Sequence, residues 1–245
     1  MNIILHGANG AMGRAVEKCM TAGGKHQIAA YISPSYTDTA PPRYKALSDY
    51  DGPADCIIDF SSHFAAAQLT EYAAKRRIPV VIATTGYSEE ELALIKACSE
   101  KVPVFLSANM SLGVAVLAKL AKTAASFFPD ADIEIVEYHH NRKVDAPSGT
   151  ALVLANKIKE ERPEAEFVLG RSGHGKRKKQ DIGISAVRLG NEVGTHEVYI
   201  ATESQVITLT HRAQSRDLFA EGAVSAAEFL VMQGPGFYGK DDLTQ

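Results

Sequence analysis

Residues 137–151 have the sequence EYHHNRKVDAPSGTA and place two histidines, a lysine and a helix start within fifteen positions. The residues before this stretch include a β-branched run typical of a strand, and apolar residues recur at helical spacing after it. Histidine exchanges protons near neutral pH, and lysine does so where its surroundings favour the neutral amine. The segment therefore combines groups for proton transfer with the junction between a strand and a helix.

The letters PSGT mark the start of that helix. Ala146 precedes a proline, which favours an extended backbone, and Ser148 can cap a helix whose first free N–H groups belong to Gly149 and Thr150. Those donors, together with the positive end of the helix dipole, suit a carboxylate or a phosphate. Lys143 adds positive charge next to them. The segment therefore predicts a substrate site for an anion.

The two histidines are consecutive, His139 and His140. In a straight strand consecutive side chains point to opposite faces, so either the strand bends or the two histidines differ in role. A histidine pair taken alone is more often structural than functional. The adjoining helix start favours the functional interpretation here.

The composition is that of an ordinary globular protein with 245 residues, of which 45% are hydrophobic. A net charge of -3 with mixed signs argues against general nucleic-acid binding, and no apolar run is long enough for a membrane helix. The first residues lead directly into a strand pattern without a cationic secretory segment. We therefore expect a cytoplasmic protein without nucleic-acid or membrane partners.

The three cysteines, Cys19, Cys56 and Cys98, are far apart and lie beside apolar neighbours, so we expect them to be small core residues. His139 and His140 lack the spaced cysteine or carboxylate partners of a closed zinc site. The sequence therefore predicts no metal centre.

A strand, a glycine-rich turn and a helix open the chain. Residues 2–6 are apolar, and residues 7–13 read GANGAMG, a GxxGxxG variant of the dinucleotide fingerprint. Three glycines alone would be weak evidence, but further strand and helix patterns follow and predict a parallel, doubly wound sheet. These patterns are a strand at 27–32, a strand at 54–60 with a helix from His63, a strand at 78–83 with a helix from Ser88, and a strand at 102–108.

Small polar residues follow the predicted strands at 61–62, 84–86 and 108–111, where such sheets bind ligands. An NAD-preferring site usually carries an acidic residue about twenty positions past the glycines. Here Ser33 occupies that region, and with Ser35 it could donate hydrogen bonds to a ribose phosphate. The sequence therefore leaves NADH and NADPH both open.

Taken together, the motifs resemble the 4-hydroxy-tetrahydrodipicolinate reductase (dihydrodipicolinate reductase) family over almost the whole chain. The most specific is HHNRKVDAPSGTA, and GANGAMG, ATTG, SANMSLGV, GISAVRLGNEVGTHEV and HRAQSR also match. The resemblance implies an α/β protein with a Rossmann-type parallel sheet at 1–110 and a central α+β domain with an open mixed sheet at 111–216. It also implies a segment at 217–245 that returns to the first domain, and a homotetramer.

The same resemblance implies reduction of a cyclic dicarboxylate with NADH or NADPH in lysine biosynthesis by the diaminopimelate pathway. It makes His139 a proton donor or acceptor and Lys143 a second proton donor. His140, Gly149 and Thr150 would hold the substrate carboxylates. The expected coenzyme contacts are Gly7, Ala8, Asn9, Gly10, Ala11, Met12, Ser33, Ala83, Thr84, Thr85, Ser107, Ala108, Asn109 and Met110.

Three positions depart from the family pattern: Ser33 replaces a common acidic residue, Ala83 replaces the first glycine of GTTG, and Ala115 replaces an asparagine. From residue 182 onward, strand patterns separated by turn residues predict antiparallel strands, and 218–232 reads as a helix. The basic run at 171–179 is expected to be a solvated loop, with nucleic-acid contact and closure of Arg171 over the substrate as alternatives.

Two other functions fit parts of the pattern. One is another two-domain NAD(P)-dependent dehydrogenase that acts on an amino acid, an imine or a polyol, because a Rossmann half followed by a mixed sheet is widely shared. The other is a noncatalytic sensor of nicotinamide nucleotides, which would have no need for His139 and Lys143 beside an anion-binding helix start.

Overall fold

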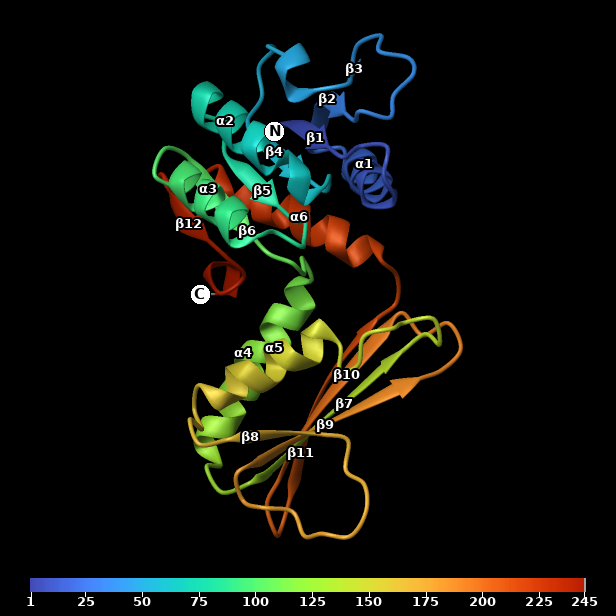
Figure 1. Ribbon diagram of the computed structural model, residues 1–245, viewed down its shortest axis with the longest axis vertical. Coiled ribbons are helices and arrows are strands. Elements are labelled where there is room, and N and C mark those ends of the chain that lie inside the picture. Colours follow the sequence, from blue (N-terminus) through green and yellow to red (C-terminus); the bar gives the residue numbers. More distant parts are fainter. Residues whose placement is uncertain (245) are drawn as a thin grey trace. The chain divides into compact units, whose positions relative to one another are not determined.

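The computed structural model describes residues 1–244, so the predicted segment 217–245 ends outside the described residues. The described chain forms two compact units, each with its own sheet (Figure 1). The first unit contains Met1–Ser111 and Asp217–Leu243, and the second contains Leu112–Arg216. The expected class, a Rossmann-type parallel sheet followed by an open mixed sheet, is confirmed.

The sheet of the first unit has the strand order β12-β6-β5-β4-β1-β2-β3, and its neighbouring strands pair in parallel. Its strands are β1 (Asn2–His6), β2 (Gln27–Ile32), β3 (Arg43–Tyr44), β4 (Cys56–Asp59), β5 (Val80–Ile82), β6 (Pro103–Leu106) and β12 (Gly236–Tyr238). Its α-helices are α1 (Ala11–Gly23), α2 (Ala66–Arg76), α3 (Glu89–Ser99) and α6 (Asp217–Leu230). The order reverses between β4 and β1, the usual ligand position in such sheets.

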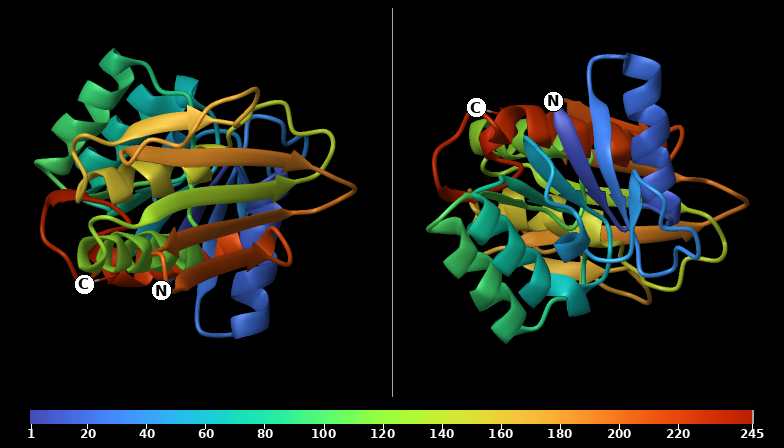
Figure 2. Two further views of the ribbon diagram at one scale, coloured as in Figure 1. Left: turned by 90° about the horizontal axis from the view of Figure 1, so that it is seen from below. Right: turned by 90° about the horizontal axis from the view of Figure 1, so that it is seen from above.

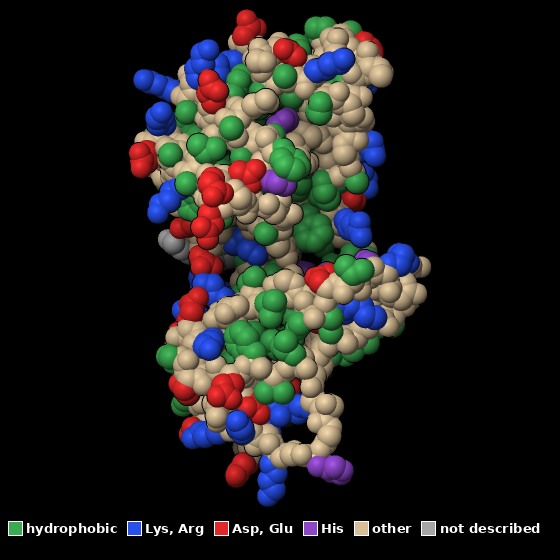
Figure 3. Space-filling model, viewed as in Figure 1, with side chains coloured by type: hydrophobic (Ala, Val, Ile, Leu, Met, Phe, Trp, Pro, Cys, Tyr) green, Lys and Arg blue, Asp and Glu red, His purple; other side chains and the backbone are tan. Residues whose placement is uncertain are grey.

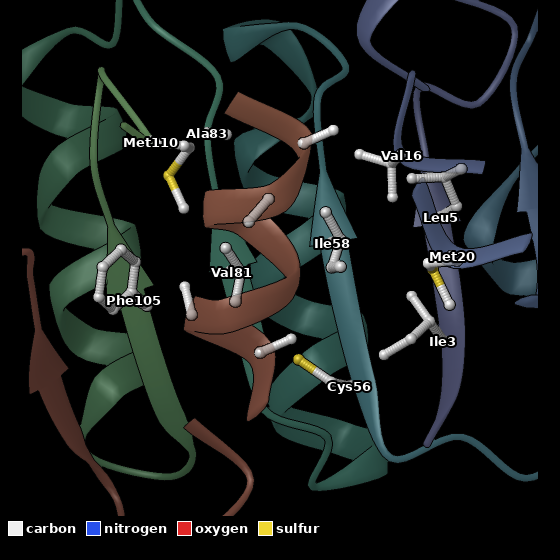
Figure 4. Close-up of a cluster of buried hydrophobic side chains, with 14 of the residues drawn as sticks. Ile3, Leu5, Val16, Met20, Cys56, Ile58, Val81, Ala83, Phe105 and Met110 are labelled. Carbon is white, nitrogen blue, oxygen red and sulfur yellow. The ribbon is translucent and has the colours of Figure 1, made fainter. Parts of the chain in front are cut away.

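Helices cover both faces of this sheet, which explains why its central strands are apolar at consecutive positions. Ile3 and Leu5 point into the core under α1 and α6, whereas Ile4 between them belongs to the core on the opposite face. Figure 4 shows the first of these cores, where side chains from four strands point toward α6. Cys56 and Cys98 are buried as expected, and Cys19 is half-buried.

The second unit packs two helices against one face of a five-stranded sheet (Figure 2). The helices are α4 (Leu112–Phe127) and α5 (Gly149–Lys159). The strand order is β11-β10-β7-β9-β8, with β7 (Asp132–His139), β8 (Glu166–Leu169), β9 (Asp181–Arg188), β10 (Gly194–Ala201) and β11 (Val206–Ala213). Ile133 and Ile135 of the central strand lie in the core beneath the helices.

The prediction of antiparallel strands from residue 182 was wrong for the first of them. β9 pairs in parallel with both β7 and β8, whereas β10 is antiparallel to β7 and β11. A parallel neighbour requires the chain to return to the start of the strand, and the long loop after β8 does this. Turn residues alone do not show whether the next strand runs antiparallel to the previous one or whether the loop returns the chain so that the next strand runs parallel to it.

Serine caps begin two of the predicted helices. Ser88 accepts a hydrogen bond from the backbone of Glu91 at the start of α3, and Ser148 accepts one from Ala151 at the start of α5. The predicted C-terminal helix is α6, and the helix expected from His63 begins as a 3-10 turn before α2. No described helix is both long and apolar enough to cross a bilayer.

Candidate functional site

The glycine turn of the first unit is shaped by close backbone contacts. Gly7 has φ +80°, and a Cβ at this position would lie 2.4 Å from the carbonyl oxygen of Phe60. A Cβ on Gly13 would lie 2.5 Å from the carbonyl oxygen of Gly7, so the helix can pack against the turn only without a side chain there. Gly10, the N-cap of α1, has no side chain to cap the helix. The N–H groups of the first helical turn are thus suited to a phosphate.

The predicted coenzyme residues all lie at carboxyl ends of strands in this unit. The turn from β1 into α1 holds Gly7, Ala8, Asn9, Gly10, Ala11 and Met12; Ser33 follows β2; Ala83, Thr84 and Thr85 follow β5; and Ser107, Ala108, Asn109 and Met110 follow β6. The side chain of Met110, however, is buried in the hydrophobic core. Only 4% of the surface of Met110 is exposed, so this residue offers a coenzyme little surface for contact.

Asp59, at the end of β4, is a feature that the motif analysis missed. Its carboxylate is fully buried and accepts hydrogen bonds from the hydroxyls of Ser61 (2.6 Å) and Thr84 (2.8 Å). The Nδ1 atom of His6, at the end of β1, lies 2.8 Å from the same carboxylate. One buried charge thus joins the carboxyl ends of three neighbouring strands where the predicted coenzyme residues begin.

The end of β2 carries hydroxyls in place of the usual acidic residue. The Ser33 and Ser35 hydroxyl oxygens are 2.8 Å apart, and the Asn9 side-chain amide donates to Ser35 (2.9 Å). The Arg43 guanidinium lies 5.8 Å from the ring centre of Tyr36, on the segment that follows. This part of the first unit therefore presents neutral polar groups and a cation.

In the second unit, β7 ends at His139, so the strand does not continue through both histidines. His139 Nδ1 is hydrogen-bonded to Oε2 of Glu137, whose carboxylate is completely buried. The two Nη atoms of Arg188, at the end of β9, donate to the two oxygens of Glu137 at 2.9 and 2.8 Å. Although burial raises the pKa of Glu137, hydrogen bonds from His139 and Arg188 outweigh it and hold the pKa at about 2.

The start of α5 joins the same cluster. The Ser148 backbone N–H donates to Glu137 Oε1 (3.1 Å), and the Ser148 hydroxyl oxygen lies 3.1 Å from Nε2 of His196 on β10. The His196 ring meets the His139 ring edge-on, with centroids 5.2 Å apart. Burial and the nearby His139 lower the pKa of His196 to about 4, so His196 is neutral at pH 7.

The loop between β7 and α5 carries the remaining predicted substrate residues. Lys143 Nζ lies 2.8 Å from Oδ1 of Asp145 and is largely shielded from solvent. Burial and the neighbouring cations, Arg142 first, lower the pKa of His140. Gly149 is exposed at the start of α5, with open space where a Cβ would be, and Thr150 follows it. The second unit thus gathers cationic and neutral donors around an exposed helix start.

The basic run at 171–179 lies at the other end of the sheet. Arg171 binds Glu134 and Asp181, which are near the starts of β7 and β9, whereas His139 and Arg188 are at the ends of these strands. Further cations of the run pair with acidic residues, and Figure 3 shows the two charge types intermixed in this region. Within this unit Arg171 is therefore remote from His139. The described residues include no group of three or more histidine, cysteine or acidic side chains suited to a metal ion.

Comparisons with known proteins agree with this geometry. The family model for the N-terminus of dihydrodipicolinate reductase matches residues 1–110, and the model for its C-terminus matches residues 113–244. The 4-hydroxy-tetrahydrodipicolinate reductase of Caldanaerobacter subterraneus subsp. tengcongensis is 47% identical, with 100% of this chain and 98% of the relative covered. The enzyme of Clostridium tetani is 42% identical, with 98% and 96% covered.

A solved structure is also similar over its whole length. It is a dipicolinate-bound dihydrodipicolinate reductase from Paenisporosarcina sp. TG-14, with a TM-score of 0.79 and 25% identity, and the alignment covers 99% of this chain and 98% of that one. The family models together span nearly the entire sequence, and each unit carries the residues on which the resemblance was based. The chain therefore belongs to the dihydrodipicolinate reductase family.

Proposed function

We propose that this chain reduces 4-hydroxy-tetrahydrodipicolinate (dihydrodipicolinate) to tetrahydrodipicolinate in the diaminopimelate route to lysine, with NADH or NADPH as the reductant. The observation that carries the proposal is the cluster around His139 and Lys143 beside the exposed start of α5. This cluster offers acids for proton transfer and donors for carboxylates. The relatives that bear this activity in their names match the chain over essentially its full length.

The first unit suits a nicotinamide coenzyme, which supplies hydride when bound. The Gly7 and Gly13 positions keep the turn next to β4 tight, and the uncapped start of α1 offers N–H groups for the pyrophosphate. Ser33 and Ser35 present hydroxyls where a ribose or a ribose phosphate would be held. We propose that the fourteen residues predicted from the sequence form the coenzyme site, in which Met110 is buried.

The second unit suits the dicarboxylate. Its carboxylates would be held by His140, which follows β7, and by Thr150 and the N–H groups at Gly149, which lie at the positive end of α5. After or with loss of the 4-hydroxyl group as water, hydride addition to ring carbon 4 displaces electron density toward the ring nitrogen. It leaves an enamine that needs a proton on carbon. Lys143 and His139 are the acids that we propose for the proton transfers of this reaction.

A lysine substitution tests the proposed acid. Lys143→Ala is expected to lower kcat at least tenfold, because general acids contribute on the order of 10²–10⁴-fold, without changing coenzyme affinity. Lys179→Ala is the matched control, since Lys179 is also ion-paired (2.6 Å to Asp130) but lies in the basic run at the other end of the sheet. Normal turnover in Lys143→Ala would remove Lys143 from the mechanism.

The activity itself is tested by a coupled assay. Purified protein is supplied with freshly made product of the preceding synthase, and oxidation of each coenzyme is followed by its absorbance. Oxidation that depends on the dicarboxylate supports the proposal and gives the coenzyme preference. Oxidation of neither coenzyme at any substrate concentration would reject it.

The sheet of the second unit also supports a proposal about assembly. Helices cover one face, whereas Tyr138 and Tyr199 are only half-buried on the other, where both lie near the carboxylate of Glu197. We propose that this outer face joins the subunits of a homotetramer and that the protein is cytoplasmic. In this proposal the predicted domain 1–110 and the segment 217–245 bind the coenzyme, and the predicted domain 111–216 binds the substrate and forms the subunit contacts. Light scattering should give four chains, and Tyr199→Glu should reduce that number.

A further inference from the structure

Glu137 is a completely buried carboxylate whose hydrogen-bonding capacity is filled. Oε1 accepts from Arg188 Nη2 (2.8 Å) and from the Ser148 backbone N–H (3.1 Å). Oε2 accepts from Arg188 Nη1 (2.9 Å) and is also bound to His139 Nδ1. An ionised carboxylate has about four acceptor positions, and the surrounding groups occupy all of them. Each of the four surrounding groups must therefore donate a hydrogen to the Glu137 carboxylate.

That requirement decides which nitrogen of His139 carries a proton. A negative, acceptor-only carboxylate can be bound by Nδ1 only if Nδ1 is the donor. Nδ1 therefore keeps its hydrogen whether the ring is neutral or charged, and Nε2 is the atom that gains and loses a proton. We propose that Glu137 is the positioning residue that fixes His139 as its Nδ1–H tautomer and so makes Nε2 the proton-exchanging atom toward the dicarboxylate. This inference rests on the proposed function.

Arg188 maintains this arrangement in two ways. Its positive charge compensates Glu137, because a carboxylate with no exposed surface would be costly to keep ionised alone. Its Nη2 atom also donates to the backbone carbonyl oxygen of Asp145 at 2.7 Å, and the Asp145 side chain forms an ion pair with Lys143. The same guanidinium thus connects Glu137 to the loop that carries the second proposed acid.

The space around Nε2 agrees with its proposed role. A Cβ on Gly194 would lie 3.1 Å from His139 Nε2, so the absence of a side chain leaves room at this atom. The Ser148 hydroxyl oxygen accepts from the Ala151 N–H (3.2 Å) and lies 3.1 Å from His196 Nε2, so a neutral His196 can form a hydrogen bond with it in either tautomer. His196 is then a neutral neighbour that does not oppose a positive charge on His139.

The first test uses the wild-type protein and needs no substrate. Protein labelled with ¹⁵N-histidine is studied by NMR at alkaline pH, where the nitrogen shifts distinguish the two neutral tautomers. We expect the resonance assigned to His139 to show a hydrogen on Nδ1 and none on Nε2, although free imidazole side chains favour the reverse. A neutral His139 with its hydrogen on Nε2 would overturn the proposal, whatever the enzyme's activity.

The second test uses Glu137→Gln, which preserves shape but replaces one oxygen with an NH₂ donor. An NH₂ group at the Oε1 position would oppose the donors of Arg188 and Ser148, whereas at the Oε2 position it would donate to His139 Nδ1 and favour the other tautomer. The glutamine therefore no longer forces His139 into the Nδ1–H tautomer. We expect kcat to fall at least about tenfold, while the KM for the coenzyme stays within about threefold. The matched control is Asp181→Asn, since Asp181 is also buried and bound by an arginine and a backbone N–H, but at the start of β9.

The outcomes separate the possible explanations. Loss of kcat in Glu137→Gln with retained kcat in Asp181→Asn supports positioning, and equal losses would indicate a structural role only. If Glu137→Gln does not fold, Gly194→Ala replaces it: kcat should fall while the tautomer of His139 stays unchanged. Unaltered kcat in folded Glu137→Gln would contradict the proposal. Wild-type protein that is inactive with the dicarboxylate but shows the Nδ1–H tautomer would reject the proposed function and not the positioning.

Discussion

Asp59 offers a sharp test of how the first unit holds its ligand-binding edge. The substitution Asp59→Asn keeps the size of the side chain but removes its charge and replaces one acceptor oxygen with a donor. The buried carboxylate accepts from the hydroxyls of Ser61 and Thr84 at 2.6 and 2.8 Å and lies 2.8 Å from His6 Nδ1. In one orientation an asparagine removes the acceptor for Ser61 and His6, and in the other the Thr84 hydroxyl must change from donor to acceptor.

The size of the effect follows from these contacts. A hydrogen bond to a charged group contributes about 1.5–3 kcal/mol, and a buried donor left unsatisfied costs about 1–3 kcal/mol. Because at least one such bond is lost, we expect Asp59→Asn to reduce the free energy of unfolding of the first unit by about 2–4 kcal/mol. Coenzyme affinity should fall as well, since Thr84 is among the predicted coenzyme contacts.

The assay is urea unfolding with and without NADH. Coenzyme shifts the transition of the unit that binds it, which identifies the transition to compare. The control is Asp55→Asn, because Asp55 immediately precedes the same strand and its exposed carboxylate accepts from the Asn2 backbone N–H (2.6 Å). This control should lose less than about 1 kcal/mol. A loss below about 1 kcal/mol for Asp59→Asn, with unchanged NADH affinity, would refute the reasoning.

Three further outcomes are expected. Gly7→Ala should lower the free energy of unfolding by at least about 2 kcal/mol and impair coenzyme binding, because Gly7 has φ +80° and the new Cβ would lie 2.4 Å from the Phe60 carbonyl oxygen. Gly23→Ala is the control, since a Cβ there meets open space, and calorimetry should show little change in its stability. Folding lowers the pKa of His196 from 6.5 to about 4, so between these pH values the unfolded chain binds a proton that the folded protein does not. The free energy of unfolding should therefore fall as the pH drops from 6.5 to 4, and His196→Gln should reduce this dependence on pH. Ser33→Asp should reduce kcat/KM with NADPH relative to NADH, because a carboxylate repels the 2′-phosphate, and an unchanged ratio would place that phosphate elsewhere.

Local patterns predicted much of the fold because they express local physics. Short apolar runs identified strands such as β1 and β2, and serine caps at Ser88 and Ser148 identified the starts of α3 and α5. Short strands such as β8 and β12 were missed, since few residues carry too weak a pattern. The parallel pairing of β9 depends on a long return loop whose path the sequence does not encode locally.

The residues of the candidate site were likewise predictable where they are close together in the sequence and hidden where distant strands bring them together. The segment containing His139 and Lys143 is continuous in sequence, so its residue types were visible together. Glu137 was visible too, but its partner Arg188 lies 51 positions away on another strand, and only the β7–β9 pairing brings them together. Asp59 was similarly hidden, because a carboxylate at the end of an apolar strand gives no sign of the hydroxyls that will surround it.

The central claim is that this chain transfers hydride from a reduced nicotinamide to the ring of a cyclic dicarboxylate. The most direct measurement supplies coenzyme deuterated at the transferable position of nicotinamide C4, together with freshly made substrate, and analyses the product by mass spectrometry and NMR. We predict one deuterium per product molecule, at ring carbon 4. Oxidised coenzyme without deuterium in the dicarboxylate product would contradict the account.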